Sequence, residues 1–327
     1  MASSPDSSNF DRRQELMAIE AANLIGLLKT KYSVPGLNKQ LLPRKMVNHM
    51  LEDSLSHKLT LITAPAGYGK TSAVLKWLEQ SQLPAAWLSI DAWDNDALVF
   101  WRYFCAAVES ISTGISKDIK YVFASQELFK VNMHLSILID NLSSIVSDFS
   151  LILDDLHLIT NPAIYDGLSY FLSYMPTNMH LVLISRVTPR LNLERLGLKE
   201  DLIRIGPNEL RVETEEITQY YKARGYFLQN EEIKKIESYT EGWAAALVAV
   251  AQSLKNERYR HNIISSFGSC NQHIENYLAE DVFNTWTGKH QDFMEKTAIL
   301  DRLCGSLCQA VTDYDGNRLL KDMYEQN

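Results

Sequence analysis

Between residues 58 and 205, short apolar runs alternate with longer segments in which apolar residues recur every three or four positions. Continuous apolar runs of this length are typical of strands that are buried on both faces of a parallel sheet. The longer segments have the period of amphipathic helices. The pattern therefore predicts an α/β domain, with a five-stranded parallel sheet and helices on both faces. We expect the strands at Lys58–Thr63, Ala86–Ile90, Ser150–Leu153, His180–Ile184 and Leu202–Ile205.

Helical spacing dominates the rest of the chain. The segment after Asp96 places apolar and aromatic residues on one face, which predicts a helix packed on the core, and an N-terminal helix is expected over Arg12–Lys31. Beyond Arg211 the strand patterns stop. Thr214 is expected to cap one helix that Gly225 ends, and Asn230 opens another that stops at Gly242. Short helical patterns broken by Gly305 and Gly316 follow, up to Tyr324.

Composition narrows the class of protein. The chain has 327 residues, 46% apolar and 22% charged, which indicates a globular protein of two or three compact units. A net charge of −8 opposes direct DNA binding, because DNA affinity comes largely from Lys and Arg. The polar start lacks a signal peptide, and no apolar run reaches the roughly 20 residues of a membrane span, so we expect a cytoplasmic protein.

The four cysteines lack metal-site spacing. Cys304 and Cys308 are four residues apart, so a shared helical face would bury both as small apolar residues, although a redox or metal pair is the alternative.

The segment Ala64–Thr71 has the pattern of a phosphate-binding P-loop, except that Ala64 stands where the first glycine is usual. Gly67 and Gly69 allow backbone N–H groups to turn inward, Lys70 reaches the β and γ phosphates, and Thr71 offers a hydroxyl to Mg²⁺. A glycine-rich turn that happens to contain Lys is the alternative. A strand before the segment and a helix after it favour ATP or another nucleoside triphosphate.

Two further strand ends carry polar chemistry. The run Phe149–Asp155 is an apolar strand that ends in two carboxylates, where Asp154 would hold Mg²⁺ through water and Asp155 could polarise the attacking water. The strand before Ser185 ends at Arg186, which would reach the γ-phosphate if this strand lies between the P-loop strand and the Asp154 strand. An acidic turn and a solvated arginine are the alternatives.

Five motifs together resemble the N-terminal nucleotide-binding module of MalT-like transcriptional activators, which are large LuxR-type regulators of the STAND class of signal-transduction ATPases. The most specific is the Asp-Asp-x-His-Leu-Ile-x-Asn-Pro run that starts at Asp154. The resemblance covers about Val34 to Asn327 and rests on Ile62–Thr71, Trp87–Asp91, Leu153–Pro162, Leu183–Arg186 and Glu241–Ala244.

The resemblance implies an organisation of the chain: a leader and helix at 1–33, a P-loop nucleotide-binding domain at 34–210, a helical domain at 211–262 and a truncated winged-helix domain at 263–327. It also implies that Leu42-Pro43-Arg44 contacts adenine, whereas Ala244 replaces the proline of the Gly-x-Pro that many relatives have and weakens the expectation of a base contact there. Nucleotide contacts are expected from Pro43, Arg44, Ala66, Gly67, Tyr68, Gly69, Lys70, Thr71, Ser72 and Arg186, metal contacts from Thr71 and Asp154, and catalysis from Asp155, Lys70 and Arg186.

In such proteins ADP holds a closed monomer, whereas ATP and an inducer open it and drive self-assembly, and slow hydrolysis resets the switch. We expect this chain to be a weak ATPase of that kind, which meets inducer and DNA only through domains that it lacks. Two alternatives remain open: a STAND ATPase with an effector that does not bind DNA, and a small-molecule P-loop kinase, although nothing marks an acceptor site.

Overall fold

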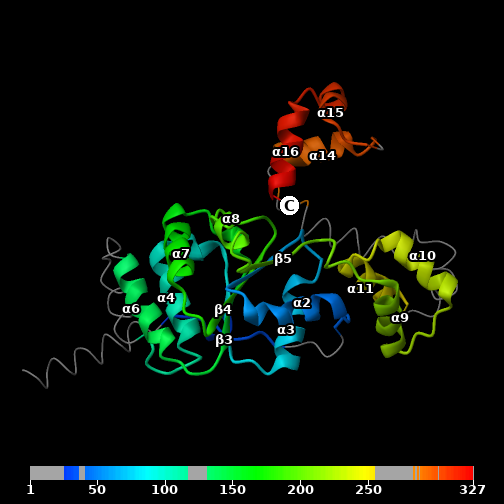
Figure 1. Ribbon diagram of the computed structural model, residues 1–327. Coiled ribbons are helices and arrows are strands. Elements are labelled where there is room, and N and C mark those ends of the chain that lie inside the picture. The colour runs from blue at the N-terminus through cyan, green and yellow to red at the C-terminus, as the bar shows by residue number, and fades with distance from the viewer. Residues whose placement is uncertain are drawn as a thin grey trace, which may run out of the picture.

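The computed structural model describes residues 26–36, 41–116, 131–254, 283, 286, 288–300 and 302–326. A five-stranded parallel sheet lies at its centre, as the apolar runs predict (Figure 1). Each strand lies within two residues of its expected bounds. The strands are β1 (Leu59–Thr63), β2 (Ala85–Ser89), β3 (Phe149–Asp154), β4 (Met179–Ser185) and β5 (Leu202–Ile205).

The strand order is β2-β3-β4-β1-β5, so β4 lies between the strand that precedes the P-loop and the strand that ends at Asp154. This is the order on which the expected role of Arg186 depends. In the register, Thr63 pairs with Ser185 and Ser89 pairs with Asp154. Because the strands are parallel, the loops after β1, β3 and β4 meet at one edge of the sheet, where ligands of such sheets bind.

Helices cover both faces of the sheet, which confirms the predicted fold class. One face packs against α4 (Ala97–Val108), α6 (Val131–Ser143) and α7 (Pro162–Tyr174), and the other against α2 (Lys45–Asp53) and α3 (Lys70–Ser81). Alternate strand residues serve the two faces: Leu151 and Leu153 point to the first, and Ile152 to the second.

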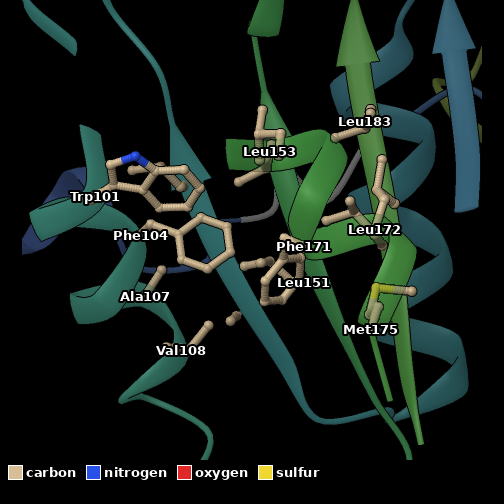
Figure 2. Packing of buried hydrophobic residues seen from close by; sticks show 14 of the residues in the cluster. Trp101, Phe104, Ala107, Val108, Leu151, Leu153, Phe171, Leu172, Met175 and Leu183 are labelled. Atoms are coloured by element: carbon tan, nitrogen blue, oxygen red, sulfur yellow. The ribbon is translucent and has the colours of Figure 1, made fainter. Parts of the chain in front are cut away.

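The first face has an aromatic core (Figure 2). Trp101 and Phe104 of α4 are fully buried against β3 and α7. The rings of Phe104 and Phe171 pack edge to face, with their centroids 5.3 Å apart. The aromatic residues after Asp96 are therefore core, as their spacing predicts. The described residues of this region also form short helical elements: η1 (Lys29–Lys31), η2 (Ser54–Ser56), η3 (Ala92–Asn95), η5 (Leu156–Leu158) and α8 (Glu194–Gly197).

The predicted N-terminal helix falls mostly outside the described residues. At its expected end the chain forms only the short 3-10 helix η1 rather than an α-helix. Lys31 nevertheless anchors this segment, because its Nζ donates to Asp91 Oδ2 at 2.8 Å and Asp94 Oδ1 at 2.7 Å.

The predicted helical region contains α9 (Thr214–Ala223), α10 (Asn230–Thr240) and α11 (Ala244–Ser253), which share an apolar cluster of their own. The expectation that Thr214 caps α9 is wrong. Glu213 is the N-cap residue, and its backbone N–H donates to Glu216 at 3.2 Å. The Thr214 hydroxyl instead donates to Glu237 Oε2 at 2.6 Å, which ties α9 to α10.

The last described segment contains α14 (Gly288–Thr297), α15 (Gly305–Thr312) and α16 (Gly316–Gln326), packed around Phe293, Cys308 and Leu319. Gly305 and Gly316 begin helices, as their role as breaks predicts. The prediction for the cysteine pair is half wrong, because Cys308 is buried but Cys304 is the exposed N-cap residue of α15. Among all the described helices, none combines the length and apolar character that crossing a membrane requires.

Candidate nucleotide-binding site

The loop Ala64–Thr71 connects β1 to α3, the strand-loop-helix context that a P-loop requires. Gly67 and Gly69 have φ values of +78° and +75°, which lie in the left-handed region that glycine adopts at little cost. Backbone of this kind directs successive N–H groups to one side, and the N-terminus of α3 adds its positive end. The loop is therefore shaped to hold an anion.

Lys70, the first residue of α3, is 8% exposed. Its Nζ donates to the carbonyl oxygens of Ala64 at 2.7 Å and Pro65 at 3.0 Å, so the ammonium group folds back over the loop. Burial lowers the pKa of Lys70 to about 8. An anionic phosphate in the loop would restore the favourable environment that this buried charge lacks.

Thr71 and Asp154 meet beside the loop. The Thr71 hydroxyl lies 3.1 Å from Asp154 Oδ1 and 3.0 Å from Oδ2, and Asp154 is 5% exposed. Burial, together with the neighbouring charge of Asp155, raises the pKa of Asp154 to about 7. A hydroxyl and a carboxylate in contact suit Mg²⁺, because this ion prefers oxygen ligands. The charge of the ion would also favour the ionised form of the carboxylate. The residues present therefore fit the expected metal.

Asp155 follows β3 in the left-handed conformation, with φ of +59°, which is uncommon for residues other than glycine. Its side chain is about half exposed and lines a cavity. His157 Nδ1 lies 3.8 Å from Asp155 Oδ1, and burial lowers the pKa of His157 to about 4, so this ring is neutral near pH 7. Backbone strain of this kind concentrates at functional sites.

Arg186 directly follows β4 and is half-buried. It lines the same cavity as Lys70 and Asp155, and its positive charge contributes to the lowered pKa values of both Lys70 and His157. The three sequence-predicted strand ends therefore converge on one site.

The cavity has a volume of about 550 Å³, within the range of small-molecule sites. One wall is the P-loop with Ser72, and the opposite wall comes from α9 and α11. The wall residues from the helical region are Tyr220, Arg224, Ala244, Ala245, Val248, Ala249 and Gln252.

Sequence reasoning missed Tyr220 and Arg224. The Arg224 guanidinium lies 3.6 Å from the centre of the Tyr220 ring, a cation–π arrangement. The Tyr220 hydroxyl is buried and has no hydrogen-bond partner within the described part of the chain. No local pattern marks either residue, because their place in the site depends on how α9 folds back toward the P-loop.

Only part of the segment expected to contact adenine lines the cavity. Leu41, Leu42 and Arg44 line the cavity, whereas Pro43 is half-buried outside its lining. Arg44 is 4% exposed, and its guanidinium donates to the carbonyl oxygens of Leu210 and, at 2.8 Å, Tyr68.

Three further residues expected to contact the nucleotide or the metal differ in whether they line the cavity. Among the P-loop residues, Tyr68 lies outside the lining and packs against the apolar cluster beneath α2 and α3. Asp154 lies behind Thr71 rather than in the cavity lining. Ala66 contributes to the lining, as expected.

Known proteins resemble this chain in sequence and in fold. Residues 279–327 match the family model of the MalT winged helix domain. The chain is 28% identical over 288 residues to the HTH-type transcriptional regulator MalT of Vibrio parahaemolyticus, covering 87% of this chain and 32% of that protein. It is also 28% identical over 305 residues to MalT of Yersinia pestis, covering 92% and 34%. The chain thus spans about a third of the length of these relatives.

Two solved structures share the fold. One is a STAND protein with a tetratricopeptide repeat sensor from Pyrococcus horikoshii, with a TM-score of 0.53 and 16% identity over 89% of this chain and 40% of that one. The other is a Walker-type ATPase of Pyrococcus abyssi, with a TM-score of 0.55 and 16% identity over 89% and 91%. The resemblance to MalT-like regulators is confirmed, and the fold is that of P-loop ATPases.

Proposed function

We propose that this chain is the nucleotide-binding switch module of a MalT-like transcriptional regulator, which binds ATP or ADP with Mg²⁺ and hydrolyses ATP slowly. The observation that carries the proposal is the convergence of Lys70, Thr71, Asp155 and Arg186 in one cavity, with Asp154 directly behind Thr71. The similarity to MalT regulators supports the choice of this class.

The charge of the cavity suits a polyphosphate. The lining contains four positively charged side chains, against the half-exposed carboxylate of Asp155: they are Arg44, Lys70, Arg186 and Arg224. Lys70 would exchange two neutral carbonyl partners for phosphate oxygens. Thr71 and Asp154 would hold Mg²⁺, which supplies charge neutralisation for the phosphates. Leu41, Leu42 and Val248 offer an apolar wall of the kind that suits a nucleobase.

Hydrolysis in this arrangement is assigned to Asp155, which would orient the attacking water at the end of β3. The neutral His157 beside it adds no positive charge that would weaken this carboxylate as a base. Arg186 would contact only the γ-phosphate and so distinguish ATP from ADP. A switch requires this difference, because a ligand shifts a conformational equilibrium only through its differential affinity for the two states.

The proposed division into a nucleotide-binding domain at 34–210, a helical domain at 211–262 and a winged-helix domain from 263 belongs to the same hypothesis. So do ATP-dependent self-assembly, contact with inducer and DNA through other parts of the protein, and a cytoplasmic location. The match of residues 279–327 to the MalT winged helix domain supports the last of the three divisions.

The experiment is isothermal titration of ADP and of a non-hydrolysable ATP analogue, with Mg²⁺, into wild type and Lys70→Ala. We expect the variant to lose binding, because Lys70 supplies the main side-chain charge facing the phosphates. Lys76→Ala is the matched control, since Lys76 lies on the same helix, outside the cavity lining, and pairs with Glu79 at 2.6 Å. Equal affinity of Lys70→Ala and wild type would refute the site.

A further inference from the structure

Five consecutive carbonyl oxygens of the P-loop accept hydrogen bonds. Backbone carbonyls that are shielded from water need such partners, and Ala64 is buried while the next four residues are partly buried. The φ values of Gly67 and Gly69 suit a loop whose N–H groups turn toward an anion. The donors are Lys70 Nζ to Ala64 and Pro65, Trp243 Nε1 to Ala66 at 3.2 Å, Ala245 N to Gly67 at 3.0 Å, and Arg44 to Tyr68 at 2.8 Å.

These donors fall into three groups: Arg44 before the motif, Lys70 within it, and two residues at the start of α11. Lys70 belongs to the motif itself, and its bonds would be exchanged when it turns to a phosphate. Trp243 and Ala245 lie at the start of α11, more than 170 residues along the chain. Ala66 and Gly67 are therefore held from outside the motif, by the helical region.

The contact between α11 and Gly67 is also tight. A Cβ atom at Gly67 would lie 2.8 Å from Ala245 Cβ and 2.8 Å from the Trp243 indole. Atoms do not approach so closely without displacement, so Gly67 is required for the docking of α11 as well as for its positive φ. The same helix forms a wall of the cavity through Ala244, Val248 and Ala249.

We propose that Trp243 is a positioning residue, which fixes the P-loop in its anion-binding shape and makes nucleotide affinity depend on the docking of α11. This rests on the proposed function. Movement of α11 away from the sheet would remove a wall of the cavity and leave two P-loop carbonyls without partners. By linkage, a bound nucleotide strengthens the docking of α11 by the same factor.

The test compares wild type with Trp243→Phe and Trp243→Ala by titration of ADP and a non-hydrolysable ATP analogue. Phenylalanine keeps an aromatic ring but removes the indole N–H, and we expect both nucleotides to bind about three- to ten-fold more weakly, as one lost hydrogen bond predicts. Alanine also removes the contact with Gly67 and should weaken both nucleotides further. Trp93→Phe is the matched control, because Trp93 is 84% exposed.

Tryptophan emission gives a second readout, which reports whether the surroundings of Trp243 change when nucleotide binds. Saturating ADP should alter the emission of wild type and Trp93→Phe, whereas Trp243→Phe should lose most of that change, because Trp243 touches the loop that holds the phosphates. Urea unfolding without nucleotide checks that the variants fold.

Unchanged affinities in Trp243→Phe, with wild type binding normally, would refute this inference and leave the proposed function intact. A loss of unfolding free energy without a loss of affinity would refute it equally. Failure of wild type itself to bind nucleotide would refute the proposed function, and this inference with it.

Discussion

Replacing Asp154 with asparagine should stabilise the folded protein at pH 8 when Mg²⁺ and nucleotide are absent. Asp154 is 5% exposed, and burial together with the charge of Asp155 raises its pKa from 3.8 to about 7. Between these two values the folded state retains a proton that the unfolded state has lost. Stability therefore falls as pH rises from about 4 to 7 and stays low above that range.

The size of the effect follows from the same pKa values. A rise in pKa from 3.8 to about 7 corresponds to about 4 kcal/mol of unfolding free energy, because each pKa unit corresponds to about 1.4 kcal/mol. This is an upper limit, because water and the surrounding groups relax around a charge. Asparagine keeps an oxygen that can accept from Thr71 and carries no charge, so we expect Asp154→Asn to gain about 2–4 kcal/mol at pH 8.

The attraction between Asp154 and Lys70 opposes this gain, but it is the smallest of the causes acting on either pKa. The assay is urea unfolding of wild type and variant between pH 5 and 8 in the presence of EDTA. The difference between them should shrink as pH falls toward 5. Asp148→Asn is the control, because Asp148 is exposed just before the same strand. A variant less stable than wild type at pH 8 would refute the reasoning.

Four other results are expected. Arg186→Ala should weaken a non-hydrolysable ATP analogue by about ten-fold and leave ADP nearly unchanged, because one charge-assisted hydrogen bond to the γ-phosphate is lost; equal losses in paired titrations, with the exposed Arg190→Ala as control, would contradict the sensor role. ATP turnover in a phosphate-release assay should be well below about 10 s⁻¹, and Asp155→Ala should lower it further while ATP stays bound; rapid turnover would favour the kinase alternative. The affinity for Mg²⁺–ATP should decline as pH falls below about 7, because Asp154 must be ionised to hold the metal; calorimetry with and without Mg²⁺ checks this, and the same decline without Mg²⁺ would contradict it. The chain should show no specific DNA affinity at physiological salt, given its net charge of −8; a promoter shift by this chain alone would refute that.

The sheet could be predicted from the sequence because its signal is local. A buried parallel strand is a short continuous apolar run, and β4 shows this most clearly, since all its residues from Met179 to Ser185 are buried. The meeting of the candidate site residues after β1, β3 and β4 followed from the same runs, since parallel strands bring their carboxyl ends to one edge. The order of the strands is not local, and only the resemblance to known ATPases suggested it.

The opposite wall of the site could not be predicted in the same way. Tyr220 and Arg224 lie on an ordinary amphipathic helix, and their residue types would equally suit a core position and a solvated face. Arg44 lines the cavity, but the bonds from its guanidinium to the carbonyl oxygens of Leu210 and Tyr68 had no signal in the sequence. Such contacts depend on where the helical region packs against the sheet. The spacing of apolar residues predicts the helices themselves but not this packing.

Trp243 shows why the local and the non-local parts of the site have different roles. The P-loop motif specifies its own glycines, lysine and hydroxyl, and these suffice to recognise a phosphate. It does not supply partners for the carbonyls of Ala66 and Gly67, which accept from Trp243 and Ala245 of α11. A site that another region must complete is sensitive to the position of that region. A nucleotide switch requires this sensitivity, because binding can then bias the docking of α11 and the docking of α11 can bias binding.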